Sequence, residues 1–122
     1  MIPNPYQKYQ KNMVETVTPA QLVLMLYNGA IRFIKQAQMG LEEEKLEVCH
    51  QNILKAQDIL TELMTTLDLE QGDIARNLYR LYDYMYHRLV DANIKKDAEL
   101  LSEVQLLLSE LRDTWSEAIK LA

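Results

Sequence analysis

The sequence is poor in the residues that end strands and crosslink small folds. Its 122 residues include three glycines, three prolines and a single cysteine. One cysteine cannot form an internal disulfide framework, and no N-terminal run resembles a signal peptide or a membrane span. Valine and isoleucine rarely alternate with polar residues, so a β-sheet has little to form its strands. These absences predict an all-α chain that stays in the cytoplasm and does not insert into membranes.

Positive charge is also in short supply. The 13 lysines and arginines are outnumbered by 18 aspartates and glutamates, which gives a net charge of −5. Nucleic-acid binding depends on clustered lysine and arginine, so this balance predicts no nucleic-acid partner. Arg76, Arg80 and Arg88 alternate with tyrosines, but Asp83 and Asp91 lie in the same run and favour a solvated helix face.

Catalytic and metal-binding patterns are incomplete. The run from Glu47 to His50 matches the Glu-x-x-His motif of di-iron bundles, but those proteins need two copies and further inward carboxylates. His50 and His87 lack the downstream lysine and glycine of phosphotransfer histidines. No serine or cysteine has a recognisable base, and no glycine-rich loop is present to bind phosphate. The sequence therefore predicts no enzyme, no cofactor and no metal site.

The stretch from Thr18 to Ala37 predicts a helix with an unusually wide apolar face. Thr18 and Gln21 fit a capping box, and Pro19 suits the first helical position. The main apolar row is Leu22, Val23, Leu26, Ala30, Phe33, Ile34 and Ala37, and a second row of Leu24, Tyr27 and Ile31 lies beside it. Together they span roughly 200°, against just over about 100° for a simple amphipathic helix. Either the helix touches neighbours on both sides or part of this face binds another chain.

Three more helices follow, and their apolar residues recur at spacings of three and four. The expected inward rows are Leu46, Cys49, Ile53, Ala56, Leu60, Leu63 and Leu67; then Ala75, Leu78, Tyr82, Met85, Leu89 and Ala92; and finally Leu100, Val104, Leu107, Leu111 and Ala118. Gly40 is expected to end the first helix, while Asp73 and Asp97 are expected to cap the third and fourth. Cys49 should be a small buried residue.

Short connections favour antiparallel neighbours, so we expect an antiparallel up-down four-helix bundle. The chain should be one domain, with the bundle over residues 18–122. Residues 1–17 should form a short N-terminal cap segment, helical or extended. Its Tyr6, Tyr9 and Met13 imply docking on something, although incidental aromatics in a frayed terminus remain an alternative.

Extra apolar residues flank the inward rows on several helices. Tyr79, Tyr86 and Val90 lie on one flank of the third helix, and four tyrosines occur within residues 79–86. Such half-wet aromatics are typical of binding surfaces. Leu101, Leu108 and Trp115 recur every seven residues beside the last inward row, although a neighbouring helix could cover them. The candidate partner-binding residues are therefore Tyr6, Tyr9, Met13, Leu24, Tyr27, Ile31, Tyr79, Tyr86, Val90, Leu101, Leu108 and Trp115.

Four segments together resemble the flagellin export chaperone family FliS. They are the run from Tyr6 to Tyr9, TPAQLVLMLYNGAIRFI from Thr18, IARNLYRLYDYMYHRLVDAN from Ile74 and ELRDTW from Glu110. The resemblance spans essentially the whole chain. One departure is Asn28, where the family usually has aspartate.

The resemblance implies a helical bundle that binds the disordered C-terminal segment of flagellin in apolar grooves. It also implies that the chaperone prevents premature filament assembly and delivers flagellin to the export gate of the type III secretion apparatus. In that family the N-terminal segment can occupy part of the client surface. The alternative from the residues alone is a structural bundle that self-associates through its apolar flanks, for example as a homodimer.

Overall fold

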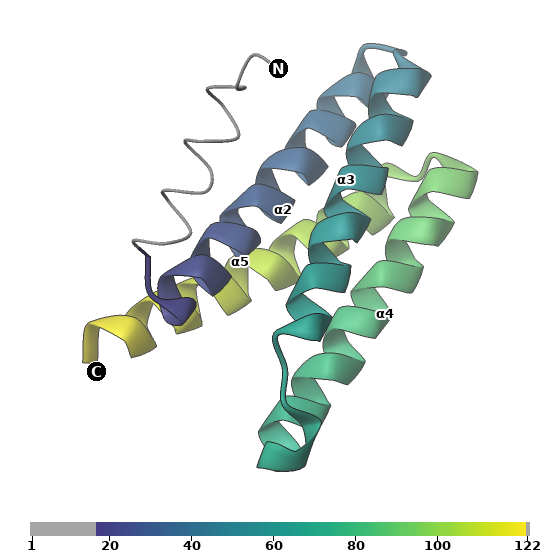
Figure 1. Ribbon diagram of the computed structural model, residues 1–122. Coiled ribbons are helices and arrows are strands. Elements are labelled where there is room, and N and C mark those ends of the chain that lie inside the picture. The colour runs from purple at the N-terminus through teal and green to yellow at the C-terminus, as the bar shows by residue number, and fades with distance from the viewer. Residues whose placement is uncertain (1–16, 122) are drawn as a thin grey trace, which may run out of the picture.

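The computed structural model describes residues 17–121, which are almost entirely helical (Figure 1). The elements are α2 (Pro19–Glu42), α3 (Leu46–Thr65), the 3₁₀ turn η1 (Leu69–Gln71), α4 (Asp73–Lys95) and α5 (Ala98–Leu121). No strand occurs in this part of the chain. The all-α prediction is confirmed.

Two of the predicted helix caps are formed as expected. Thr18 Oγ1 accepts a hydrogen bond from the Gln21 amide at 3.1 Å, and Gln21 Oε1 accepts one from the Thr18 amide at 3.1 Å. This reciprocal pair is the predicted capping box. At the last helix, Asp97 Oδ1 accepts from the Glu99 amide at 2.9 Å. Both caps satisfy amides that a helix start leaves without partners.

Two other predicted helix boundaries were wrong. Gly40 does not end α2, which continues to Glu42; instead a Cβ built at Gly40 would lie 2.9 Å from the Cys49 backbone nitrogen. The glycine is therefore needed for close approach of α3. Asp73 is the first residue of α4 rather than its cap, and its carboxylate pairs with Arg76 at 3.0 Å. Gly72 takes the cap position with a φ of 124°, a conformation that glycine adopts without strain.

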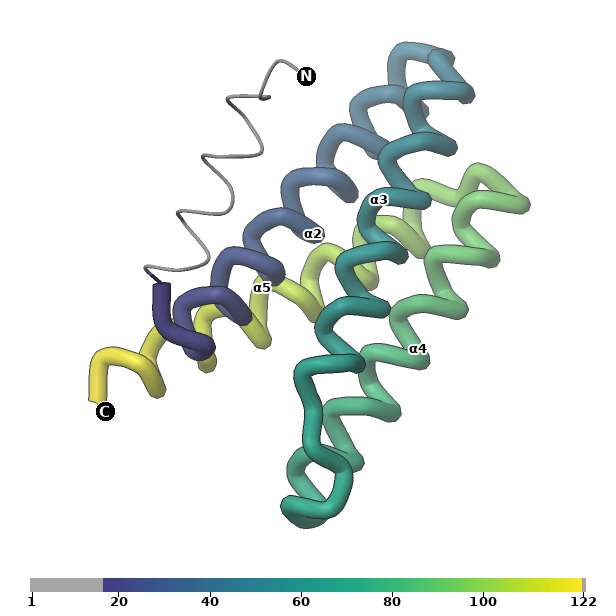
Figure 2. Tube along the Cα trace, viewed as in Figure 1, coloured from purple at the N-terminus to yellow at the C-terminus, as the bar shows by residue number. Residues whose placement is uncertain are grey.

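The four long helices pack in a ring. Helix α2 packs against α3 and α5, and α4 packs against the same two helices. Sequential helices run in opposite directions (Figure 2), which gives the predicted antiparallel bundle. The helices do not stay parallel, because the α2–α5 pair and the α3–α4 pair separate toward one end (Figure 1). We call this the divergent end; it contains the start of α2, the end of α5 and the η1 connection.

The core lies along the middle of the ring and is supplied by all four helices. Its fully buried large side chains include Ile34, Ile53, Leu60, Met85 and Leu89. The inward rows predicted for α3 and α4 are confirmed over most of their length, although Leu46 at the start of α3 is 53% exposed. Cys49 is fully buried, as predicted, and burial raises the pKa of its thiol. It therefore behaves as a small apolar core residue.

The two helical glycines of α2 give a first prediction. Gly40→Ala should lower the free energy of unfolding, because overpacking costs about 1–3 kcal/mol and the better helix propensity of alanine returns only about 1 kcal/mol. Gly29→Ala is the matched control: its Cβ would meet only the end of the Ile59 side chain, at 3.1 Å, which can move aside. Urea denaturation measures both. Equal stability of the Gly40→Ala and Gly29→Ala variants would contradict the close contact at Gly40.

Candidate partner-binding surface

Four predicted partner-binding residues are core residues. The exposed fractions of Tyr27, Ile31, Leu101 and Leu108 are 1%, 3%, 0% and 0%, so no partner can touch them while the bundle is closed. Their assignment to surface flanks was wrong for two reasons. In α2 both apolar rows are buried, because this helix touches neighbours on both sides, which was one of the two alternatives for its wide apolar face. In α5 the buried face is shifted by one position from the expected row. In α5 the buried residues are Leu101, Val104 and Leu108, whereas Leu100, Leu107 and Leu111 are half-buried. The two leucine rows of this helix have exchanged roles.

Tyr27 has a structural role that its sequence position did not indicate. Its hydroxyl forms a hydrogen bond with the hydroxyl of Tyr82, across the core from α2 to α4. The two rings are tilted, with centroids 6.3 Å apart. Burial raises the pKa of both hydroxyls above their ordinary value of 10.0. Each phenol satisfies the other, so the core holds two polar atoms without leaving either unpaired.

The remaining predicted residues within the described chain are accessible. Tyr79 is 38% exposed, while Leu24, Tyr86, Val90 and Trp115 are half-buried. Tyr79, Tyr86 and Val90 share one side of α4, which we call the α4 flank. Asn93 has a similar helical phase and its Nδ2 lies 2.8 Å from His50 Nδ1, so the flank is on the α3 side. Tyr6, Tyr9 and Met13 lie outside the described residues.

Trp115 ties α5 to α2 at the divergent end. Its Nε1 donates a hydrogen bond to the Ala20 carbonyl oxygen at 2.8 Å, in the first turn of α2. The indole packs partly against the core. The Nε1 edge of the indole is thus fixed to α2, while the rest of the indole remains accessible.

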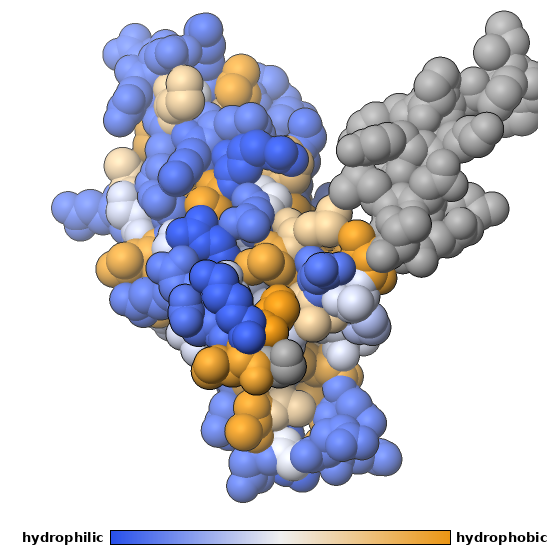
Figure 3. Space-filling model, turned by 90° about the vertical axis from the view of Figure 1, so that its left-hand side faces the viewer, coloured by the Kyte–Doolittle hydropathy of each residue, from blue (hydrophilic) through white to orange (hydrophobic). Residues whose placement is uncertain are grey.

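Half-buried apolar side chains gather around the divergent end. They come from the start of α2, the end of α3, the start of α4 and the end of α5, and all pack partly against the core. Together with the exposed Leu69 and Ile74 they form what we call the divergent-end surface: Val23, Leu26, Met64, Leu67, Leu69, Ile74, Leu78, Leu81, Leu111 and Trp115. Figure 3, which looks at the molecule from the left of Figure 1, shows apolar residues grouped in the centre and lower half of this face.

Most of this surface was missed by the sequence analysis, which assigned Val23, Leu26, Leu78 and Leu111 to inward rows. The helical period predicts which residues form an apolar row. It does not show whether a neighbouring helix packs against the whole length of that row. Here the helix pairs separate, so rows that begin in the core end at the surface. Ile74, with 80% of its side chain exposed, is the clearest case.

A polar cluster marks the outer side of the α4–α5 interface. Arg88 Nη2 and Glu103 Oε2 are 2.7 Å apart, and the Tyr84 hydroxyl also donates to Glu103. The guanidinium of Arg88 holds the pKa of the Glu103 carboxyl below its ordinary value. Tyr84 is 45% exposed, so part of its ring is accessible to solvent. These contacts link two helices and form no reactive pair.

Within residues 17–121 no three histidine, cysteine, aspartate or glutamate side chains are grouped to hold a metal ion. None of the helices in that range has the length and apolar character that a membrane crossing needs. The surface described above offers apolar contact area framed by polar residues, which suits binding of a protein segment.

Comparison with known proteins agrees with the resemblance found in the sequence. Residues 2–122 match the family model described as flagellar protein FliS. The chain belongs to the FliS family. A FliS described as a flagellar secretion chaperone from Bacillus subtilis is 44% identical over 119 residues, covering 98% of this chain and 89% of its own. The Salmonella typhimurium FliS is 37% identical over 109 residues, covering 88% and 81%.

A solved structure supports the same fold. The crystal structure of a bacterial flagellar chaperone matches with a TM-score of 0.80, covers 96% of both chains and shares 20% sequence identity. FliS proteins are chaperones of flagellar secretion and not enzymes, so the prediction of a non-catalytic chaperone role is confirmed through the family.

The position at which this chain departs from the FliS pattern, Asn28, lies close to Arg112 of α5. Asn28 is exposed on α2, and its Oδ1 lies 3.5 Å from Arg112 Nη1 on α5. An aspartate at this position would form an ion pair with Arg112, whereas asparagine makes a neutral and long contact. An exposed ion pair contributes little to stability, so asparagine is accommodated at small cost.

The buried tyrosine pair gives a second prediction. Because folding raises both pKa values above the unfolded value of 10.0, the contribution of this pair to stability should be fully present below pH 10 and should fall as pH rises above it. Above pH 10 each hydroxyl should contribute a slope of at most about 1.4 kcal/mol per pH unit. Chemical denaturation from about pH 8 to about pH 11 measures the slope.

The double variant Tyr27→Phe/Tyr82→Phe should flatten this dependence, and Tyr79→Phe is the exposed control that should not. Each buried single variant should cost about 1–3 kcal/mol because it leaves one hydroxyl unpaired. A double variant that loses as much as both single variants together would contradict the pairing.

Proposed function

We propose that this chain binds the C-terminal segment of flagellin in the cytoplasm, prevents its premature assembly and delivers it to the export gate of the flagellar type III secretion apparatus. Membership of a family of flagellar secretion chaperones supports the proposal. The observation that carries it is the divergent-end surface, where apolar rows from all four helices reach solvent.

The proposed binding mode follows from the shape of these rows. A flagellin tail that cannot bury its own apolar face would become helical and lay that face against the rows, with anchors spaced by three and four residues. Ordering such a segment costs several kcal/mol, so a large contact area is needed. The divergent-end surface and the α4 flank supply two separate apolar areas on the bundle. A segment that wraps from one to the other would use both.

The third prediction tests the location of the client. A peptide with the C-terminal sequence of flagellin from the same organism should bind one-to-one in calorimetry and gain helicity in circular dichroism. Ile74→Ser should weaken this binding by roughly tenfold to a hundredfold, because burial of an isoleucine side chain contributes about 1.5–3 kcal/mol.

Ile94→Ser is the matched control. Ile94 lies on the same helix with 77% of its side chain exposed, but at the opposite end of the bundle. The control should bind the peptide as the unchanged chain does. Equal losses in both variants would rule out the divergent end as the site, and no binding at micromolar concentration would reject flagellin as the client.

We also propose that the N-terminal segment covers part of the divergent-end surface, with Tyr6, Tyr9 and Met13 making the contacts. The fourth prediction is that deletion of residues 1–12 leaves a cooperative thermal transition, because among the described residues 17–121 a buried core is formed by residues 27–108 of all four helices. The deletion should also increase the affinity for the flagellin peptide, since a site occupied by its own chain must first be vacated. Unchanged affinity would mean that these residues do not compete with the client.

A further inference from the structure

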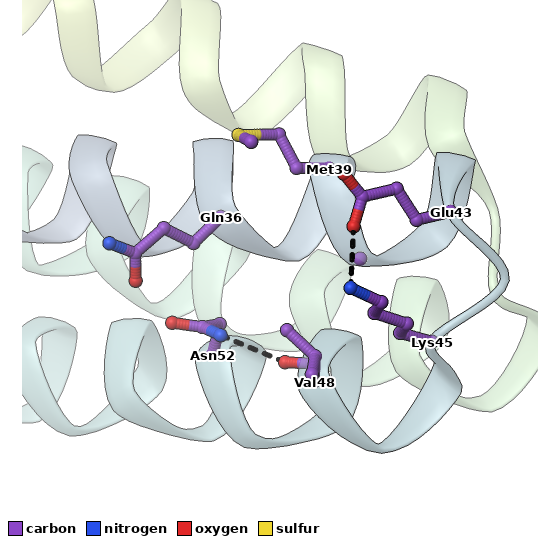
Figure 4. A pocket seen from close by; sticks show the side chains of 7 residues that line it. Gln36, Met39, Glu43, Lys45, Val48 and Asn52 are labelled. Atoms are coloured by element: carbon purple, nitrogen blue, oxygen red, sulfur yellow. Dashed lines mark hydrogen bonds and ion pairs between the residues drawn. The ribbon is translucent and has the colours of Figure 1, made fainter.

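A small pocket lies at the opposite end of the bundle from the divergent-end surface, where α2 turns into α3. Its volume is about 210 Å³, smaller than the roughly 300–1,000 Å³ of typical small-molecule sites, so it fits one side chain rather than an enclosed metabolite. The lining residues, shown in Figure 4, are Gln36, Met39, Gly40, Glu43, Lys45, Val48 and Asn52.

Asn52 holds a hydrogen-bond acceptor that nothing in the described chain satisfies. The residue is 8% exposed, and its Nδ2 donates to the Val48 carbonyl oxygen at 2.9 Å, as the dashed line in Figure 4 shows. Its Oδ1 is buried, and no donor among residues 17–121 reaches it. A buried acceptor without a partner costs about 1–3 kcal/mol, and few native side chains carry that cost without a reason. An N–H or O–H group brought by an occupant of the pocket would satisfy this acceptor.

The rest of the pocket restricts the occupant further. Met39 and Val48 provide apolar walls that are 57% and 43% exposed, and Gly40 also lines the pocket. Glu43 stands at the rim, and residues 42–47 contain four glutamates against the single Lys45. An aliphatic stem that ends in a cationic N–H donor matches all of these features. Arg32 and Lys55 lie over the Phe33 ring, and neither lines the pocket.

We propose that this pocket binds the side chain of a lysine or arginine presented by a partner protein. The stem lies between Met39 and Val48, and the head donates to Asn52 Oδ1 while facing the Glu43 carboxylate. Lys45 already pairs with Glu43 at 3.1 Å, and both side chains are more than half exposed, so this pair is weak and can be exchanged. Lys45 is thus a competitor of the incoming cation. The site does not depend on flagellin being the client.

The test follows the side-chain amide signals of Asn52 and Gln36 by ¹H–¹⁵N NMR in the full chain. The probes are Nα-acetyl-arginine methylamide and Nα-acetyl-lysine methylamide. Both should give saturable shifts at these two amides, with a dissociation constant on the order of millimolar, as expected for a single side chain. Nα-acetyl-citrulline methylamide, which keeps the N–H donors without the charge, should bind several-fold more weakly. Nα-acetyl-norleucine methylamide, which has neither, should give no saturation.

Three variants should move the affinity in different directions. Asn52→Leu should abolish saturable binding, read at the Gln36 amide, and should keep or raise the melting temperature because the unpaired acceptor is gone. Glu43→Gln should weaken binding severalfold, whereas Lys45→Gln should strengthen it by removing the competitor. Glu62→Gln, an exposed charge change elsewhere on α3, is the control and should leave binding unchanged.

Several results would overturn the proposal. Equal shifts with the norleucine probe would make the pocket merely apolar, and non-saturating shifts spread over all acidic residues would make the effect general screening. A lowered melting temperature in Asn52→Leu would mean that Oδ1 is already hydrated and satisfied. Tighter binding of free spermidine than of either capped residue would exclude a protein side chain as the occupant.

Discussion

Helix α2 packs against both α3 and α5, and the division of its apolar residues between these two interfaces determines the rest of the structure. Toward α3 the helices come so close that Gly40 has no room for a Cβ. Toward α5 the contact is fixed by the hydrogen bond from Trp115 to Ala20. At the start of α2 this helix stays packed against α5 and leaves the α3–α4 pair. The two helix pairs therefore separate at that end of the bundle.

This opening explains how a small bundle keeps apolar surface without losing its core. The fully buried layer is complete, with the Tyr27–Tyr82 pair bridging it from α2 to α4. The apolar rows then continue past the layer and reach solvent where the helix pairs separate. The core and the divergent-end surface are therefore formed by the same apolar rows at different positions along the helices. A client bound as proposed would extend the core rather than occupy a separate site.

The sequence predicted the parts of the fold that depend on local chemistry. The Thr18 capping box and the Asp97 cap involve residues three positions apart or fewer, and the buried position of Cys49 follows from an unbroken helical row. The chaperone class followed from motifs spread along the chain. Each of these signals can be read without knowing how the helices pack.

Most of the errors involve tertiary contacts. The exception is the Asp73 cap, since Gly72 takes that position and Asp73 pairs with Arg76 in the same helix. Leu100 and Leu107 differ from Leu101 and Leu108 by one position, and only the approach of α2 and α4 decides which row of α5 is buried. Gly40 looked like a helix end because the close approach of α3 leaves no trace in the local sequence. The divergent-end surface was invisible for the same reason, since no periodicity records where two helices part.

The position of Trp115 has one more consequence. It is the only tryptophan in the chain, and its half-buried indole sits at the divergent end beside the start of α2. Intrinsic fluorescence excited at the indole band therefore originates at one edge of the proposed docking area and nowhere else. Trp115 is therefore an intrinsic fluorescent probe of the surface to which a client would bind.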